Sequence, residues 1–281
     1  MGNTVTDILS FLTDHFREDF HSYSNTLIER RITERAAKLN LLGIEDYLRV
    51  LTSDPDEPSF LARMLRIRFS SFFRDPLQFE LLGSILLPAM LLSKPDIGHF
   101  RAWCAACAGG EEACTLAIII DEAKHLLASK AMVQIFATDV AEDALADARS
   151  GTYHRRSLGE VSLQRLDKYF TLKKPCYRIS DNILDMITYS RHDLLDPHTY
   201  APPESLFGGF DLISCRNFLM YLDAEAYRRV FDNLFRALNP QGVLLLGAAE
   251  AVPDLYTPYL ERIFEFGNLY RKVPNAARSE K

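Results

Sequence analysis

The chain of 281 residues lacks the features that mark secreted, membrane-spanning and nucleic-acid-binding proteins. Its five cysteines are an odd number and its first residues carry no positively charged n-region, so we expect reduced thiols in a cytoplasmic protein without a signal peptide. The longest apolar run, residues 81–92, is broken by Gly83 and Pro88 and is too short to span a bilayer. The net charge of -6 provides no basic excess, which argues against nucleic acid as a partner.

The composition that remains is that of a folded globular protein. Hydrophobic residues make up 48% of the chain and charged residues 25%, which excludes a disordered or fibrous chain. The length is comfortable for two domains. Apolar residues such as Val5, Ile8 and Leu12 recur at helical spacing, and similar patterns continue up to residue 92. We therefore expect residues 1–92 to form an all-helical domain.

Several helix ends can be predicted within this first domain. Ser24 is a candidate N-cap for a second helix, and Gly43 is a candidate stop at the end of that helix. Asp75 is followed by a proline in the first turn and by Gln78 at the capping-box position, which predicts a further helix start.

From residue 93 to residue 281 short apolar runs alternate with helical stretches. The runs predict buried parallel strands at residues 100–106, 133–138, 210–215 and 243–248, and helices between them at residues 112–127, 141–150 and 223–238. This alternation is typical of an α/β domain with a doubly wound sheet, and residues 263–273 predict a closing hairpin. Residues 152–189 fit the alternation poorly, and we expect them to form an inserted subdomain.

Candidate ligand-binding residues follow the predicted strands, because ligands of parallel sheets sit outside the carboxyl ends of the strands. Small residues at 106–110 allow close approach of a ligand, or simply tight packing of strand and helix. Asp139 is placed to bind the hydroxyls of a ribose, or to cap the next helix, and Asp193 is placed to accept from an adenine amino group. The pair Arg216 and Asn217 stands in an apolar run, where polar groups are costly unless they are bound to something.

Two further clusters were considered. Phe72 and Phe73 precede Arg74 at a helix entry, where they can close over a ligand or pack two domains together. Cys104 and Cys107 have the spacing of a redox or zinc motif, but no matching pair completes a zinc site. We expect buried thiols and no metal.

Taken together, the motifs match a known family. In chain order they are Ser71-Phe72-Phe73-Arg74-Asp75, Gly110-Glu111-Glu112, Ala137-Thr138-Asp139, Asp211-Leu212-Ile213 with Cys215-Arg216-Asn217, and Leu246-Gly247 with Glu250. In this order and spacing the chain resembles the CheR family, S-adenosylmethionine-dependent protein-glutamate O-methyltransferases of bacterial chemotaxis. The resemblance implies a class I methyltransferase domain, Rossmann-like with an antiparallel final strand, at residues 93–281. It also implies that the insert near residues 152–189 is a small β subdomain, and that S-adenosylhomocysteine is the product.

Carried over residue by residue, the resemblance implies catalytic roles for Arg74, which orients the substrate carboxylate, and for Tyr221, which shapes the path of the methyl group. It implies cofactor contacts from Arg68, Ser70, Arg74, Gly110, Glu111, Glu112, Asp139, Asp193, Leu194, Arg216, Asn217 and Phe218. Arg68 and Ser70 depart from the Asn and Thr that the family has at these positions, and Arg68 puts a cation where a small amide is expected.

Three functions follow from the resemblance. The chain is expected to methylate glutamates of chemoreceptors; the alternatives are a CheR-like module that binds the cofactor or its product without turnover, and a methyltransferase with another substrate. The basic face of Arg31, Arg35 and Lys38 is expected to dock on the helical cytoplasmic region of a receptor, with a merely solvated helix face as the competing interpretation. We expect a monomer that does not insert into membranes.

Overall fold

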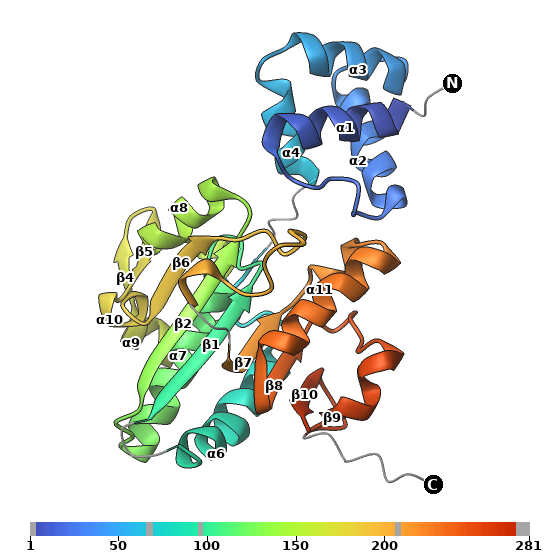
Figure 1. Ribbon diagram of the computed structural model, residues 1–281. Coiled ribbons are helices and arrows are strands. Elements are labelled where there is room, and N and C mark those ends of the chain that lie inside the picture. Colours follow the sequence, from blue (N-terminus) through green and yellow to red (C-terminus); the bar gives the residue numbers. More distant parts are fainter. Residues whose placement is uncertain (1–3, 66–69, 95–97, 206–208, 274–281) are drawn as a thin grey trace, which may run out of the picture.

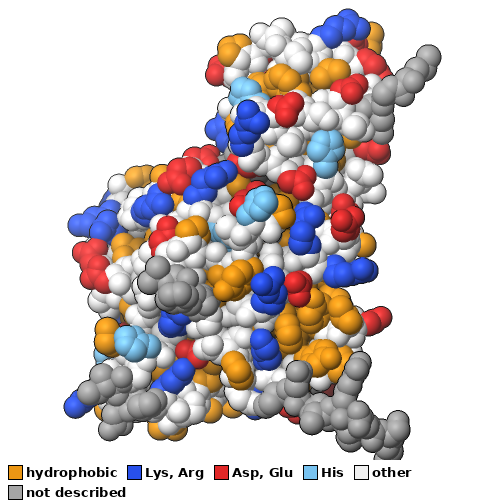
Figure 2. Space-filling view, in the orientation of Figure 1, with side chains coloured by type: hydrophobic (Ala, Val, Ile, Leu, Met, Phe, Trp, Pro, Cys, Tyr) orange, Lys and Arg blue, Asp and Glu red, His pale blue; other side chains and the backbone are white. Residues whose placement is uncertain are grey.

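The computed structural model describes residues 4–65, 70–94, 98–205 and 209–273. Figure 1 shows the first four helices grouped at one end of the molecule, beside a long twisted sheet with helices on its faces. In the view of Figure 2, Lys and Arg side chains lie scattered among Asp and Glu, without one large basic patch. No helix among the described residues has the length and apolar character needed to cross a membrane.

The helical unit consists of α1 (Thr4–Phe16), α2 (Asn25–Lys38), α3 (Ile44–Ser53) and α4 (Glu57–Leu65). These helices bury their apolar stripes against one another in a separate core that runs from Val5 to Leu65. Ser24 is the N-cap residue of α2, as predicted, but Gly43 does not end that helix. The chain leaves α2 through Asn40, which adopts a left-handed φ of 57°, and Gly43 instead precedes α3 as its N-cap residue.

A buried ion pair holds α2 to α4. The guanidinium of Arg35 donates two hydrogen bonds to the Glu57 carboxylate at 2.8 and 2.7 Å, and the Tyr47 hydroxyl donates a third at 2.7 Å. Burial alone would raise the pKa of Glu57, but the bonds from Arg35 and Tyr47 outweigh it and lower that pKa. The Arg35 side chain is only 15% exposed, so the basic face expected on α2 is left with Arg31 and Lys38.

A second helical stretch lies in the core of the sheet rather than with α1–α4. It comprises α5 (Pro76–Leu81), a π-helical turn η1 (Leu82–Leu86) and α6 (Leu87–Leu92). Its buried residues, including Phe79, Leu82 and Leu86, pack with α7 (Glu111–Leu127). The predicted division put this stretch in the N-terminal domain, whereas its apolar side is buried with the sheet.

The main sheet has seven strands in the order β6-β2-β1-β7-β8-β10-β9. The strands β6 (Ile187–Arg191), β2 (Met132–Asp139), β1 (His99–Ala105), β7 (Phe210–Cys215) and β8 (Leu238–Leu246) run parallel. The last two, β10 (Leu269–Lys272) and β9 (Leu260–Arg262), are antiparallel to their neighbours. This topology confirms the class I methyltransferase fold with antiparallel final strands.

Helices cover both faces of this sheet, as expected for a doubly wound fold. Because side chains alternate along a strand, Ala102 and Cys104 of β1 face the core under α7, whereas Trp103 and Ala105 face the core under α11 (Ala224–Ala237). The helix α8 (Glu142–Ser150) follows β2 and lies on the α7 side through Leu145.

The inserted segment forms a small antiparallel sheet in the order β3-β5-β4. Its elements are β3 (Thr152–His154), the 3-10 turn η2 (Arg155–Leu158), α9 (Leu163–Tyr169), β4 (Phe170–Lys173) and β5 (Cys176–Ile179). The chain then passes through α10 (Asp181–Leu184) to β6, which pairs with β2 in the main sheet. The predicted insert ran to residue 189. In the structure, residues 187–189 of that prediction belong instead to β6, an edge strand of the main sheet.

The helical unit and the sheet unit are joined by backbone hydrogen bonds. Tyr23 and Leu222 form an isolated antiparallel bridge. Beside it, the Ser24 N–H donates to the Tyr221 carbonyl at 2.8 Å, and the Asp223 N–H donates to the Ser22 carbonyl at 2.9 Å. The segment before α2 is therefore fixed against the segment that follows β7.

Candidate functional site

A pocket opens at the carboxyl ends of the central parallel strands, where the helical unit meets the sheet. The space between its walls, together with the open mouth, is about 880 Å³. The lining residues are Tyr23, Ser70, Arg74, Ala106, Cys107, Ala108, Glu112, Asp139, Val140, His192, Asp193, Leu194, Arg216, Asn217, Phe218 and Tyr221.

The turn between β1 and α7 forms the floor of the pocket. Ala106 and Ala108 adopt left-handed φ angles of 55° and 48°, which bend the backbone around the strand end. The Asp139 carboxylate accepts from the Ala108 N–H at 2.8 Å and from the Ala141 N–H at 2.9 Å. Asp139 is not the N-cap of α8, because Ala141 holds that position; its carboxylate binds the backbone on both sides of the strand end and also lines the pocket.

Gly110 is the N-cap residue of α7 at the end of this turn and does not line the pocket. Its φ of 85° favours glycine, and a Cβ there would lie 2.7 Å from the Ala148 Cβ. Glu111 is likewise outside the pocket; it lines a neighbouring cavity, which it shares with Ser70. Burial raises the pKa of Glu111, and a hydrogen bond with Ser70 offsets part of that rise.

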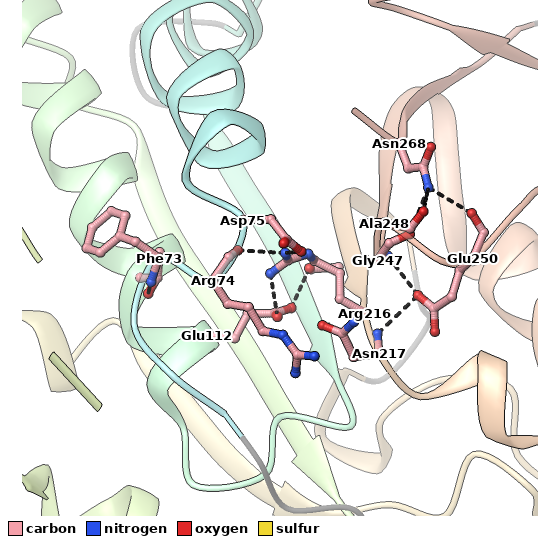
Figure 3. Close-up of polar contacts among 12 residues, drawn as sticks. Phe73, Arg74, Asp75, Glu112, Arg216, Asn217, Gly247, Ala248, Glu250 and Asn268 are labelled. Atoms are coloured by element: carbon pink, nitrogen blue, oxygen red, sulfur yellow. Dashed lines mark hydrogen bonds and ion pairs between the residues drawn. The ribbon is translucent and has the colours of Figure 1, made fainter. Parts of the chain in front are cut away.

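The side chain of Arg216 is fully buried and ties three elements together, as Figure 3 shows. It donates to Glu112 at 3.0 Å, to the Asp75 carboxylate at 2.7 Å and to the Arg74 carbonyl at 2.7 Å. Its guanidinium also lies 4.7 Å from the ring centroid of Phe79. Arg216 therefore fixes the backbone of the segment that carries Arg74.

These bonds change two expectations. Asp75 is at the N-cap position of α5, as predicted. Its side chain makes no capping hydrogen bond, however, and pairs with Arg216 instead. Glu112 lines the pocket, yet its carboxylate is held by Arg216 and by the Ser214 hydroxyl. A direct contact from Glu112 to a ligand would compete with both.

Phe72 and Phe73 are buried and do not line the pocket, which favours the packing interpretation of these two rings. Phe72 meets Tyr153 and Phe170 of the insert edge-on, with ring centroids 4.8 and 5.1 Å apart. The Phe73 ring lies 4.4 Å from the guanidinium of Arg165 on α9. The inserted subdomain thus holds the segment that precedes Arg74.

The opposite wall follows β7 and is held by Glu250, a residue of the motif set for which the sequence predicted no role. Glu250 is 3% exposed and accepts from the N–H groups of Asn217 at 3.1 Å and Phe218 at 2.9 Å. Further bonds come from Met220 at 3.4 Å and Gly247 at 2.7 Å. Figure 3 shows the Glu250 carboxylate directed toward Asn217.

The third wall follows β6. Asp193 accepts from the Leu195 N–H at 2.9 Å, and burial raises the pKa of Asp193. Burial lowers the pKa of His192, so its ring is neutral at pH 7, and its buried Nδ1 atom has no hydrogen-bond partner among the described residues. Both side chains line the pocket and provide hydrogen-bonding groups for a heteroaromatic ring.

Most residues predicted for the site meet in this pocket. They are Ser70, Arg74, Glu112, Asp139, Asp193, Leu194, Arg216, Asn217, Phe218 and Tyr221, whereas Gly110 and Glu111 lie beside it and Arg68 falls outside the described residues. Ala106, Cys107 and Ala108, which the sequence singled out only as small residues that allow a ligand to approach, also line the pocket, and the prediction did not include Tyr23, Val140 and His192. The residues beside strand ends could have been found from the strand pattern, but nothing in the sequence points to Tyr23, which comes from the helical unit.

All five cysteines are free, and in the part of the chain that the structure describes no group of three His, Cys, Asp or Glu side chains is arranged to hold a metal ion. Cys104 and Cys107 are two buried thiols, and burial raises the pKa of each.

Comparison with known proteins decides the family. A family model described as "CheR methyltransferase, SAM binding domain" matches residues 68–262, and the "all-alpha domain" of the same family matches residues 4–66. The chain belongs to the CheR family. The boundary between the two CheR domains in these matches coincides with the end of the helical core, and the larger domain is the one that binds S-adenosylmethionine in the family.

Among CheR relatives, the chain is 36% identical over 205 residues to "Chemotaxis protein methyltransferase 1" of Pseudomonas aeruginosa, covering 71% of this chain and 72% of that protein. It is 30% identical over 237 residues to "Chemotaxis protein methyltransferase" of Listeria monocytogenes, covering 83% and 84%. An uncharacterized 104.1 kDa protein of Rhodobacter capsulatus is 34% identical over 236 residues, which are 83% of this chain but only 24% of that protein. The Pseudomonas and Listeria relatives confirm a methyltransferase family that acts in chemotaxis.

Proposed function

We propose that this chain transfers a methyl group from S-adenosylmethionine to glutamate side chains of chemoreceptors, forming glutamate methyl esters. The observation that carries the proposal is the pocket at the strand ends. In a chain of the CheR family, it brings Arg74, Tyr221 and the predicted cofactor residues Asp139 and Asn217 to one cavity.

The residues of the pocket fit the cofactor. Asp139 stands at the end of β2, where an acidic side chain suits ribose hydroxyls, and Asp193 suits the polar edge of adenine. Asn217 and Phe218 provide an amide and an aromatic ring on the opposite wall. When bound, the cofactor supplies a methyl group on a positively charged sulfonium.

The remaining work falls to the chain's own residues. A glutamate side chain with an ordinary pKa of about 4.3 is already ionised at pH 7, so no general base is needed. In the proposed mechanism Arg74 orients the substrate carboxylate, and Tyr221 shapes the path toward the methyl group. Alignment of this kind is worth about 7–11 kcal/mol of barrier lowering. Tyr23 and Tyr221 stand at the junction of the two units, where they help to exclude water.

Two measurements test the proposal. Calorimetric titration with S-adenosylhomocysteine should show saturable binding at one site. Incubation with radiolabelled S-adenosylmethionine and a receptor fragment should then give base-labile label, as expected for a methyl ester. The Arg74→Ala variant should lose most of the label, since the substrate carboxylate would no longer be oriented.

The outcomes separate the candidate functions. Binding without base-labile label would favour the second candidate, a module that binds the cofactor without turnover. Full activity of Arg74→Ala would refute the role given to that side chain. Absence of binding would refute the proposal as a whole.

The proposed partner is the helical cytoplasmic region of a chemoreceptor, and this partner would place the protein in the cytoplasm. We further propose that the protein is a monomer. The exposed part of the α2 face supports docking through Arg31 and Lys38, since both side chains remain accessible after Arg35 is taken up by Glu57.

A further inference from the structure

The backbone of the segment from Asn217 to Tyr221 has N–H groups arranged to bind an anion. Asn217 adopts a left-handed φ of 57°, and the successive N–H groups of Asn217 and Phe218 converge on one carboxylate at 3.1 and 2.9 Å. Successive N–H groups in such a turn form a concavity that binds anions. Here the anion is internal, because the buried carboxylate of Glu250 fills the concavity.

The same segment carries three side chains of the pocket, those of Asn217, Phe218 and Tyr221. We propose that Glu250 is a positioning residue for methyl transfer, which sets Asn217 and Phe218 against the cofactor by holding their backbone N–H groups. This inference rests on the proposed function and adds to it a residue that lies outside the pocket lining.

Glu250 is itself held in place by Asn268, which lies beside the end of β8. The Asn268 side chain, just before β10, donates to the Gly247 carbonyl at 2.7 Å and to the Glu250 carbonyl at 2.8 Å. The Gly247 N–H donates to the Glu250 carboxylate at 2.7 Å. Figure 3 shows these contacts in sequence from Asn268 through Glu250 to Asn217. The carboxylate therefore has a fixed position against which the pocket segment is set.

The first test replaces Glu250 by glutamine. A glutamine side chain has nearly the same shape but turns one acceptor oxygen into an NH2 group, which would face backbone N–H donors. We expect Glu250→Gln to bind S-adenosylhomocysteine at least tenfold more weakly and to lower kcat for receptor methylation, since the pocket wall is displaced.

A matched control is Glu57→Gln in the helical unit. Glu57 is also buried, at 4% exposure, and its carboxylate also accepts several hydrogen bonds. It does not line the pocket. We expect Glu57→Gln to lower the melting temperature while leaving the affinity for S-adenosylhomocysteine unchanged within twofold.

A second variant perturbs the same contact without removing the carboxylate. A Cβ at Gly247 would lie 2.8 Å from the Glu250 Oε2 and 2.9 Å from the Asn217 backbone nitrogen. Gly247→Ala should therefore separate Glu250 from the pocket segment and weaken S-adenosylhomocysteine binding to a similar degree. Hydrogen exchange on the ligand-free protein should show faster exchange of the Asn217, Phe218 and Met220 amides in both variants.

The outcomes are distinct from those of the proposed function. Unchanged affinity and exchange in Glu250→Gln and Gly247→Ala would overturn the positioning role, as would an equal loss of affinity in Glu57→Gln. If the unmodified protein fails to bind S-adenosylhomocysteine, the proposed function fails. In that case the exchange of the Asn217 and Phe218 amides still decides whether Glu250 holds the segment.

Discussion

Replacement of Arg216 by methionine should destabilise the sheet unit strongly. The Arg216 side chain is 0% exposed, and its partners Glu112 and Asp75 are 14% and 38% exposed. Removing the guanidinium leaves the largely buried Glu112 carboxylate without a positive charge, with the Ser214 hydroxyl and the Cys104 thiol as remaining partners. Loss of one member of a buried ion pair costs about 3–5 kcal/mol, and we expect Arg216→Met to fall in this range.

The assay is urea denaturation followed by tryptophan fluorescence. The chain has one tryptophan, and Trp103 is buried in β1, so its emission reports on unfolding of the sheet unit. Arg149→Met is a suitable control, because Arg149 pairs with Glu142 at 2.6 Å on the surface of the same unit, where the two side chains are 43% and 60% exposed. An exposed pair of this kind contributes less than about 1 kcal/mol.

A double variant tests the physical reason. Replacing Glu112 by glutamine in the Arg216→Met background removes the uncompensated charge and should restore part of the lost stability. A loss below about 1 kcal/mol for Arg216→Met would refute the reasoning, since that is the value of a surface pair. A double variant less stable than Arg216→Met would show that the buried Glu112 charge is not the source of the loss.

Three further predictions concern other parts of the molecule. Gly110→Ala should lower the melting temperature and the affinity for S-adenosylhomocysteine, because the new Cβ would lie 2.7 Å from the Ala148 Cβ at a backbone φ of 85°; an unchanged melting curve would contradict this. The pKa of Glu57 is lowered in the folded state, so the stability it contributes is present above its unfolded pKa of about 4.5 and is lost as the pH falls through its folded pKa; Glu57→Gln should remove this part of the pH dependence in denaturation curves. Lys38→Glu should raise KM for a receptor fragment without changing the melting temperature, whereas Arg35→Glu should unfold the helical unit by opposing Glu57; an unchanged KM would refute docking through α2.

Much of the sheet could be predicted because its signals are local. Buried parallel strands are continuous apolar runs, and the residues that follow them meet at one edge of the sheet. This reasoning predicts that Asp139, Asp193 and Asn217 lie close together, and in the structure all three line one pocket. The edge strand β6, Ile187–Arg191, was not predicted, because its residues mix polar and apolar side chains.

The roles that escaped prediction depend on contacts between residues distant in the sequence. Asp75 has every local feature of a helix cap, but Arg216 binds its carboxylate across 141 positions. Tyr23 reaches the pocket only through the bridge to Leu222, which no periodicity reveals. Glu250 belongs to a recognisable motif, yet its role appears only when four N–H groups are seen to converge on it.

The position of residues 76–92 has a practical consequence for dividing the protein. A fragment that begins at residue 93 would discard Phe79, Leu82 and Leu86, which are almost completely buried in the core that α7 shares. The hydrophobic face of α7 would then be exposed to solvent and would favour self-association. A fragment that begins at residue 70 would keep this helix together with Arg74 and Asp75, and so is the natural unit for separate expression.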